Sequence, residues 1–302
     1  MSDSVISDIF DNETAALEKS SPEETSGAVL YSDGLEMGCV ELFVKDVAAV
    51  SQFYVACGLA ILSSSDNEVV LGSTERAVVR LIQSDLPAFS RSSAGLYHLA
   101  IVFASRGELA KALKRVFDLY PHLYQGSADH LVSEAFYFSD PEGNGVELYL
   151  DRDASGWKWK NGMVVMDSLY LDEKEYIAKY EGQDGSDKKK LGHMHLQIGN
   201  IDIAREFYVG VLGFVVTAEF PSALFLSDGK YHHHIGMNTW HSAGAGARKK
   251  SLGLRRFEVV VSDTVVLAQI SERLRNAKLA CVENDSSITV SDPWENELVF
   301  RI

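Results

Sequence analysis

The sequence has few cysteines, few basic residues relative to its acidic ones, and no long apolar run. Three scattered cysteines in 302 residues do not form a disulfide framework and favour a reducing compartment. Lysine and arginine number 28 against 43 aspartates and glutamates, a formal net charge of −15, so we expect no nucleic-acid partner and no attraction to anionic membranes. No apolar run approaches the ~18 residues of a membrane helix, and the start, Met1-Ser2-Asp3, lacks the basic region of an export signal. We therefore expect a cytoplasmic protein.

The rest of the composition is that of an ordinary globular protein, with 46% hydrophobic and 24% charged residues. A chain of this length forms two domains or one larger unit built from repeats. Residues 1–35 are acidic and serine-rich and lack the apolar periodicity of a core. They are expected to form a flexible tail, with a short helix around residues 4–19.

Beyond the tail, two kinds of module alternate, and each occurs twice. Modules of the first kind open with an alternating strand and continue into a helix that carries a Phe-Tyr pair, at residues 53–54 and 207–208. Modules of the second kind have a strand, a helix at residues 108–120 or 265–278, and the turn signature Asp-Pro-x-x-Asn before a last strand. The four opening strands are expected at residues 38–46, 95–102, 192–200 and 253–260.

The repeats predict an α+β fold of four βαβββ modules paired into two curved mixed β-sheet barrels. A single βαβββ unit leaves one sheet face uncovered, so modules must pair to close a curved sheet around a shared concave site. The first module pair is expected at residues 36–152 and the second at 191–302. A partly structured connector rich in Trp, Lys, Asp and Gly, residues 153–190, joins them.

Two strand-borne histidines and one glutamate form the strongest candidate site. On the third opening strand, His193 and His195 share one face, and His98 begins one face of the second opening strand. Glu147 is a lone carboxylate in an apolar last strand. An inward carboxylate must be paired or bind a cation, because its uncompensated burial costs several kcal/mol. Two imidazoles and a carboxylate on rigid strands are the facial triad that holds Fe(II) or Mn(II) with open positions.

Each of these residues also has a non-functional interpretation. His98 alone is typical of a hydrogen-bonded core histidine, and a glutamate such as Glu147 most often faces solvent. The His-His-His run at residues 232–234 suits an exposed strand or an adventitious metal patch, and Tyr137, between two phenylalanines, suits a core position. The functional interpretation is favoured because several independent elements place metal-competent groups at corresponding points of a repeated scaffold.

The modular pattern resembles the vicinal oxygen chelate superfamily. The resemblance rests on strand-initial histidines and on the turn Asp140-Pro141-Glu142-Gly143-Asn144 ahead of the strand with Glu147. Residues 129–149 and 231–240 further resemble bacterial catechol 2,3-dioxygenase-like proteins, and the whole resemblance covers residues 36–302. It implies an extradiol ring-cleaving dioxygenase that acts on a catechol-type aromatic substrate with O2 at a non-haem Fe(II) 2-His-1-carboxylate site, with Mn(II) or Zn(II) as alternatives.

The resemblance leaves two ways of pairing the modules. By position, the ligand points fall on His193 or Cys39, on His98 or Arg256, and on Glu147 or Val299. Pairing in chain order splits the His-His-Glu set between two sites and adds Cys39 to one of them, where its thiolate would favour Zn(II). Crossed pairing, known in some dioxygenases of the superfamily, gives one complete site of His98, Glu147 and His193 and leaves Cys39, Arg256 and Val299 as a degenerate outer site. We therefore expect the central modules, residues 95–150 and 191–240, to form the metal site together.

The resemblance also implies catalytic residues around the metal. His232 matches the acid/base histidine on the last strand of a first-kind module, although a one-residue shift in register would select His233 or His234. His130 and Tyr137 match the histidine and tyrosine that touch the catecholate oxygens.

Two other functions share this scaffold. A glyoxalase-type metal-dependent lyase or isomerase usually uses two carboxylate ligands, and the sequence offers one evident inward carboxylate. A non-catalytic protein that binds a small aromatic ligand would have a hydrophobic pocket without a metal at these positions. His195 is expected to line the pocket or to orient a ligand, and exposed sheet edges make a homo-oligomer plausible.

Overall fold

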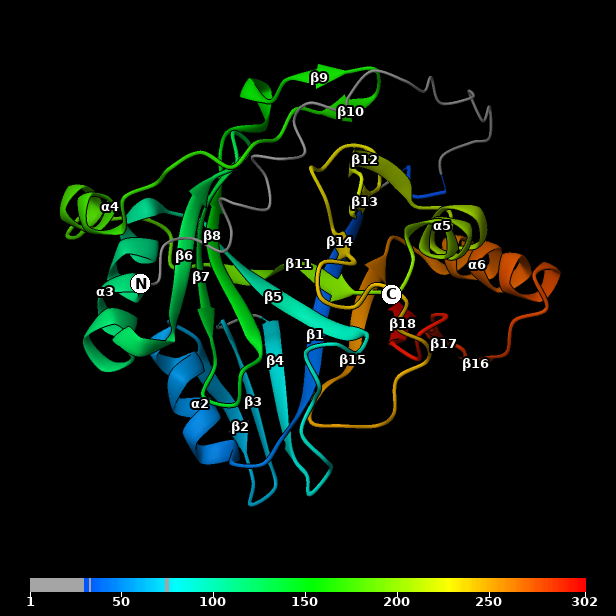
Figure 1. The fold of residues 1–302 in the computed structure, drawn as a ribbon, viewed down its shortest axis with the longest axis horizontal. Helices are drawn as coiled ribbons and strands as arrows, with labels where there is room; N and C mark the ends of the chain where they lie inside the picture. Colours follow the sequence, from blue (N-terminus) through cyan, green and yellow to red (C-terminus); the bar gives the residue numbers. More distant parts are fainter. Residues whose placement is uncertain (1–29, 33, 74–75) are drawn as a thin grey trace.

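In the computed structural model, which describes residues 30–32, 34–73 and 76–302, the chain forms two eight-stranded mixed sheets and a short hairpin (Figure 1). The helix expected around residues 4–19 lies outside the described residues. The α+β class and the paired βαβββ modules expected from the sequence are confirmed. Among the described residues, no helix combines the length and the apolar character that crossing a bilayer requires.

Four modules follow one another along the chain, with a connector between the second and the third. The first contains β1 (Leu35–Val44), α2 (Val47–Ala56), β2 (Ala60–Ser64), β3 (Glu68–Ser73) and β4 (Arg76–Gln83). The second contains β5 (Gly95–Phe103), α3 (Arg106–Leu119), η2 (Pro121–Leu123), β6 (Tyr124–Asp129), β7 (Ser133–Ser139) and β8 (Gly145–Asp151). The third contains β11 (Lys189–Gln197), α5 (Ile201–Arg205), the π-helix η4 (Glu206–Val211), β12 (Val215–Phe220), β13 (Ala223–Ser227) and β14 (Ile235–Asn238). The fourth contains β15 (Gly253–Val261), α6 (Thr264–Asn276), β16 (Cys281–Asn284), β17 (Ser287–Ser291) and β18 (Glu297–Arg301). The connector contains η3 (Ala154–Gly156), β9 (Trp159–Lys160), β10 (Met163–Val164) and α4 (Glu173–Tyr180).

The modules pair in a crossed order. The central sheet, with strand order β12-β13-β14-β11-β5-β8-β7-β6, joins the second and third modules through the antiparallel pair β5 and β11. The outer sheet, with strand order β16-β17-β18-β15-β1-β4-β3-β2, joins the first and fourth modules through β1 and β15. The helices lie outside the sheets, with α2, α3 and α4 at one end of the molecule and α5 and α6 at the other (Figure 1).

A capped helix follows the opening strand of each module. Side-chain oxygens of Asp46, Ser105, Asn200 and Asp263 accept hydrogen bonds from backbone N–H groups in the first turns of α2, α3, α5 and α6. These bonds satisfy donors that a helix leaves free. In α3, Leu109, Leu113 and Val116 recur at helical spacing, are buried, and give the helix the apolar side that contacts β5 and β8.

The central strands divide their side chains between two faces. Met194, Leu196 and Leu99 are buried in the main hydrophobic core. His193 and His195 alternate with these residues on β11 and therefore lie on the opposite face of the sheet. This second face of the central sheet carries the candidate site.

The repeated turn signature fixes where the last strand of each second-kind module begins. The Asp140 carboxylate accepts hydrogen bonds from the backbone N–H groups of Glu142 and Asn144, both at 2.9 Å, and from the Asn144 side chain at 2.8 Å. Asp292 makes the equivalent bonds to Trp294 and Asn296. In the second module this turn leads directly into β8, which places Glu147 near the start of the strand.

The structure corrects two boundaries expected from the sequence. Tyr31, assigned to the tail at residues 1–35, is buried; its ring lies 5.1 Å from that of Phe214 and its hydroxyl donates to the Leu212 carbonyl at 2.7 Å. This aromatic side chain, placed in the tail by the sequence, therefore packs on the third module. Lys189, assigned to the connector, pairs with Phe103 and begins β11.

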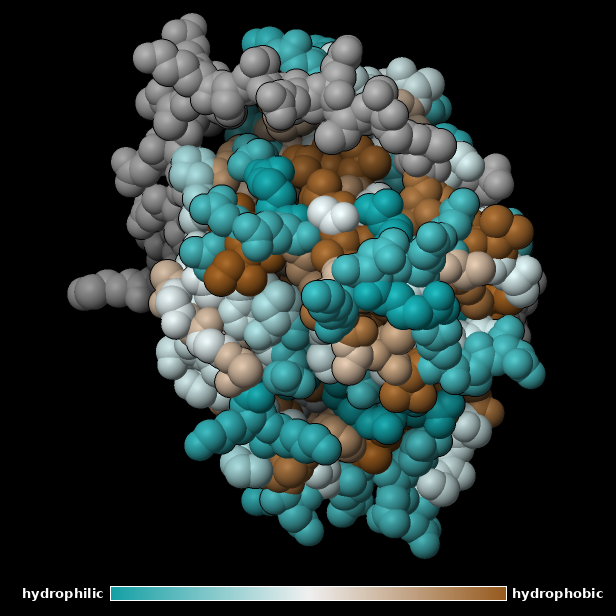
Figure 2. Space-filling model, turned by 90° about the vertical axis from the view of Figure 1, so that its right-hand side faces the viewer, coloured by the Kyte–Doolittle hydropathy of each residue, from teal (hydrophilic) through white to brown (hydrophobic). Residues whose placement is uncertain are grey.

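The surface over the second half of the chain is mixed in polarity. Hydrophilic residues interleave with hydrophobic ones on the face shown in Figure 2, and the exposed apolar side chains include Val265 and Val282. The edge strands of the outer sheet are also open, since every residue of β2 is exposed and Val282 on β16 is 72% exposed. A homo-oligomer formed through such an edge stays a prediction.

Candidate metal centre

Three neighbouring strands of the central sheet bring His98, Glu147 and His193 together. β5 lies between β8 and β11, and Ala100 on β5 pairs with Glu147 on one side and with His193 on the other. His98 lies two residues before Ala100 and therefore on the same face. The small side chain of Ala100 leaves space between the two larger neighbours.

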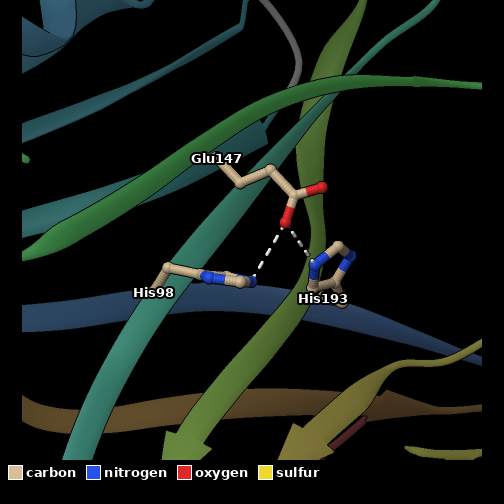
Figure 3. Close-up of side chains that lie close together, drawn as sticks. All are labelled: His98, Glu147 and His193. Carbon is tan, nitrogen blue, oxygen red and sulfur yellow. Dashed lines mark hydrogen bonds and ion pairs between the residues drawn. The ribbon is translucent and has the colours of Figure 1, made fainter. Parts of the chain in front are cut away.

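The three side chains converge on one carboxylate oxygen (Figure 3). Oε2 of Glu147 lies 3.0 Å from Nε2 of His98 and 3.1 Å from Nε2 of His193. All three residues are buried, and their candidate ligand atoms lie within 4.8 Å of one another. The structure therefore brings together the three residues predicted as metal ligands.

Burial and mutual charge set the protonation of this group. Burial acts to raise the pKa of Glu147, but the adjacent His193 and His98 imidazoles outweigh it and hold that pKa well below its usual range. Burial lowers the pKa of His193, although Glu147 partly opposes the shift. These shifts favour a deprotonated Glu147 and a neutral His193, the forms in which the two side chains bind a divalent cation.

The donor geometry fits a metal ion. Two imidazole nitrogens and a carboxylate oxygen are donors that divalent transition metals accept, and the three atoms lie within 4.8 Å of one another. Nε2 of His98 is fully enclosed, and its contact with Oε2 of Glu147 at 3.0 Å lacks the alignment of a good hydrogen bond. Such an enclosed, unsatisfied nitrogen is costly unless it binds something else. His98, Glu147 and His193 are therefore the residues that would hold the ion.

His130 and Tyr137 form a hydrogen-bonded pair beside the triad. Tyr137 on β7 lies opposite Glu147 on β8, and its ring is 5.6 Å from that of His98. Nδ1 of His130 lies 2.8 Å from the Asp167 carbonyl, which can only accept, so Nδ1 carries the proton. Nε2 of His130 then accepts from the Tyr137 hydroxyl at 2.7 Å. Burial, reinforced by the Glu147 charge, raises the pKa of Tyr137 well above its usual value.

The three consecutive histidines are all buried, so the interpretation as an exposed strand is wrong. The ring of His233 lies 4.1 Å from that of His193, whereas the ring of His232 lies 6.2 Å from it. Nε2 of His232 lies 2.8 Å from the Asp151 carboxylate. His234 packs against Tyr231, with ring centroids 4.8 Å apart, and burial lowers its pKa to about 3. His233 is therefore nearer than His232 to the predicted ligand His193.

His195 extends the cluster on the side of β14. It pairs with His98 across β5 and β11, and the two rings lie 4.8 Å apart. Its Nε2 accepts a hydrogen bond from the side-chain amide of Asn238 at 2.9 Å. This contact fixes the orientation of His195 beside His98.

Two tyrosines and an aspartate near the site were not singled out from the sequence. The Tyr231 hydroxyl donates to the Asp151 carboxylate at 2.7 Å and lies 2.8 Å from the Tyr149 hydroxyl. Glu147, Tyr149 and Asp151 alternate along β8 and share one face, a period that the sequence does contain. Gly192 is required beside them, because a Cβ there would lie 1.8 Å from the Tyr149 hydroxyl.

The corresponding points of the outer sheet hold no such ligand set. Arg256 is paired with the buried Glu41 at 2.9 Å, and Glu41 also contacts Arg80 and Arg255. Cys39 lies in the outer sheet and His98 in the central one, so the chain-order pairing expected as the alternative does not occur. Burial raises the pKa of Cys39 to about 12, so Cys39 is a thiol at neutral pH.

Comparison with known proteins agrees with this architecture. No family model matches the chain. Catechol-2,3-dioxygenase of Bacillus subtilis (strain 168) is 34% identical over 275 residues, which are 85% of this chain and 93% of the relative. A solved Bacillus subtilis structure with a provisional dioxygenase assignment is 10% identical, with a TM-score of 0.58 over 88% of this chain and 84% of that one. Glyoxalase I of Zea mays is 14% identical, with a TM-score of 0.51 over 88% of this chain and 92% of that one.

The solved structures share the fold at identities too low to carry a function. The Bacillus subtilis relative is similar over nearly its whole length, and the two sheets of paired βαβββ modules are the architecture of one superfamily. The chain therefore belongs to the vicinal oxygen chelate superfamily, in which it is a homologue of catechol-2,3-dioxygenase.

Proposed function

We propose that this chain is an extradiol ring-cleaving dioxygenase, which opens a catechol-type aromatic ring with O2. The observation that carries the proposal is the buried group of two imidazole nitrogens and one carboxylate oxygen. The name of the relative at 34% identity, catechol-2,3-dioxygenase, supports the same activity in this chain.

The proposed cofactor is Fe(II), held by His98, Glu147 and His193. Two imidazole nitrogens and one carboxylate oxygen are the donors of the facial triad that holds Fe(II) with open positions. When bound, iron supplies the redox chemistry that the side chains lack.

The neighbouring side chains would position the substrate and move its protons. Tyr137 is oriented by its bond to His130, which is held in turn by the Asp167 carbonyl. We assign this pair to contact with the substrate hydroxyl oxygens. His232, which is hydrogen-bonded to both Asp151 and His233, is assigned to acid/base catalysis.

A glyoxalase-type lyase or isomerase is the alternative, because glyoxalase I of Zea mays shares the fold. That chemistry usually uses a second carboxylate ligand. Asp151 is the other carboxylate on this face of β8, and it accepts hydrogen bonds from His232 and Tyr231 instead of joining the metal-competent group. The donor set therefore favours the dioxygenase.

The activity can be tested with protein reconstituted with Fe(II) and ascorbate. Catechol and ring-substituted catechols in air should give a yellow ring-opened product, with one O2 consumed for each ring opened. The hemithioacetal substrate of glyoxalases should remain unchanged. Iron-loaded protein that turns over the hemithioacetal but no catechol would establish the alternative function.

The metal assignment can be tested with a pair of buried carboxylates. Glu147→Gln should lower iron affinity by at least about 100-fold and abolish ring cleavage, because it removes the charged ligand. Glu134→Gln is the matched control, since Glu134 is also buried in the central sheet but pairs with Arg106 at 2.9 Å. Equal iron retention by the two variants would show that Glu147 is not a ligand.

A further inference from the structure

A small apolar cluster lies on the same face of the central sheet as the candidate metal centre. His195, Gly236 and Phe225 lie in line across β11, β14 and β13, so Phe225 shares the face of His195. This cluster is separate from the main hydrophobic core, which contains Met194 and Leu196. Its members are the buried Ala218, Ala223 and Phe225 and, packed against them, Met166, Phe220 and Trp240.

Phe225 lies one ring beyond the predicted metal ligands. Its ring centroid is 4.9 Å from that of His233 and 5.7 Å from that of His195. The His233 ring in turn lies 4.1 Å from that of His193, and the His195 ring lies 4.8 Å from that of His98. Along this part of the sheet, Phe225 is therefore the first apolar side chain beyond the histidine rings.

Trp240 lies on the same side of the site, just after the end of β14. Its ring packs edge-on against that of Tyr97 at 5.2 Å, and the Tyr97 ring lies 5.3 Å from that of His98. The indole N–H of Trp240 donates to the Ser222 hydroxyl at 2.9 Å, and its backbone N–H donates to the Asn238 side-chain oxygen at 3.2 Å. These two bonds fix the indole beside the apolar cluster.

The connector passes over this face of the sheet. Met166 packs against the apolar cluster, and the carbonyl of the next residue, Asp167, accepts from Nδ1 of His130 at 2.8 Å. Leu169 and Asp129 exchange two backbone hydrogen bonds of 2.9 Å, and β10 contacts β12 of the third module (Figure 1). The apolar cluster and His130 belong to opposite ends of the eight-stranded sheet. Consecutive connector residues therefore bridge its two ends, because crossed pairing makes the connector join the two modules that share the site.

We propose that Met166, Phe225 and Trp240 form the wall against which the substituent of a catechol ring packs, and that Met166 sets the size of substituent that fits. This inference rests on the proposed function, because a catechol held by its two hydroxyl oxygens turns the rest of its ring toward neighbouring side chains. The three wall residues carry no charge, and the carboxylates of Glu147 and Asp151 share this face of the sheet. The substrate class is therefore a catechol with an uncharged, apolar substituent, since a carboxylate substituent would be desolvated against the wall.

Size selection can be measured with the iron-loaded protein in a series of Met166 variants. The measured quantity is the KM for 4-tert-butylcatechol divided by the KM for catechol. Met166→Ala should lower this ratio about tenfold by opening the wall, and Met166→Phe should raise it about tenfold by filling the space. Met163→Ala is the matched control, since Met163 is also half-buried in the connector but lies on β10, outside the apolar cluster. It should leave the ratio within about twofold of the wild-type value.

Charge selection is measured with two substituents of similar size. The wild-type KM for 3,4-dihydroxybenzoate should be at least about tenfold higher than that for 4-methylcatechol. Equal KM values, or a preference for the carboxylated ring, would contradict an apolar wall.

Calorimetry separates the wall from the reaction. Zn(II)-loaded protein, whose metal has no redox chemistry, should be titrated with 4-tert-butylcatechol and with catechol, and the Kd ratio should follow the same order in the Met166 series. An unchanged ratio across the series, or an equal shift in Met163→Ala, would overturn the wall even if the chain cleaves catechols. A loss of stability in Met166→Ala with no change in ratio would show that Met166 only anchors the connector. The expected Kd ratios without ring cleavage by the iron-loaded protein would refute the proposed function alone, and absence of catechol binding would overturn both.

Discussion

Gly192 offers a sharp test of how tightly the candidate metal centre is packed. An ideal Cβ at this position would lie 1.8 Å from the Tyr149 hydroxyl oxygen and 2.7 Å from the adjacent ring carbon. Tyr149 is fully buried, and its hydroxyl is bonded to Tyr231 at 2.8 Å, so the ring has no open space into which to turn. The variant Gly192→Ala must therefore push the hydroxyl from 1.8 Å to an ordinary contact of at least 3.4 Å.

The expected magnitude follows from three contributions. Overpacking a close-packed interior costs about 1–3 kcal/mol, and the lost bond between Tyr149 and Tyr231 costs about 1 kcal/mol. Alanine has less conformational freedom than glycine in the unfolded chain, which raises the free energy of unfolding by up to about 1 kcal/mol. Together these terms predict that the free energy of unfolding falls by about 1–4 kcal/mol. Metal affinity should fall about tenfold as well, because His193 follows Gly192 directly and its ring lies 4.9 Å from that of Tyr149.

Urea unfolding and metal titration measure the two effects. Gly156→Ala is the matched control, since a Cβ there would meet no described residue within 4 Å apart from its chain neighbours. Its stability should change by less than about 0.5 kcal/mol. Adding Tyr149→Phe to Gly192→Ala removes the nearest atom and should restore part of the loss. The packing argument is refuted if Gly192→Ala is as stable as Gly156→Ala and binds metal equally well.

Two further predictions concern metal removal and the cysteines. When the free metal concentration is about 100 times the Kd, bound metal should raise the free energy of unfolding by about 2.7 kcal/mol. Urea unfolding with and without EDTA measures this difference. An equal difference in Glu147→Gln would show that the metal binds elsewhere. Burial raises the pKa of Cys39 to about 12 and also raises the pKa of Cys57, whereas Cys281 is only half-buried. Ellman's reagent at pH 8 should therefore react first with Cys281, and with the other two only on unfolding. Because the unfolded thiols ionise at lower pH than the folded ones, stability should also fall as pH rises above about 9. Rapid reaction of all three thiols in the folded protein would contradict this.

The alternating pattern of the strands made much of the fold predictable. Period-2 alternation places His193 and Met194 on opposite faces of a strand, and the turn at Asp140 marks the start of the strand that carries Glu147. Repetition of these local signals was enough to predict four βαβββ modules. No local sequence pattern indicates which modules pair. Cys39 and His193 occupy equivalent positions in their modules, so either could have been the first ligand by position.

The surroundings of the ligands depend on contacts between distant segments, which a single sequence does not show. Asp151 and His232 are 81 residues apart and meet through the side-by-side packing of the second and third modules. His130 is oriented by a backbone carbonyl, that of Asp167, to which any residue type could contribute. The choice between His232 and His233 likewise depends on ring placement in the bend before β14, which has no periodic pattern.

The crossed pairing also governs the order in which the protein can fold during synthesis. β1 pairs with β15, so Leu35 cannot pair until Val261 has been synthesised. The second and third modules, by contrast, can join as soon as β14 has emerged. At roughly 5–20 residues per second of translation, the first module spends at least ten seconds or so with an open strand edge. A ribosome-bound chain can therefore complete the central sheet, which carries the candidate metal centre, before the outer sheet formed by the first and fourth modules. Until then, the unpaired edge of β1 is the place where a nascent chain needs protection from other strands.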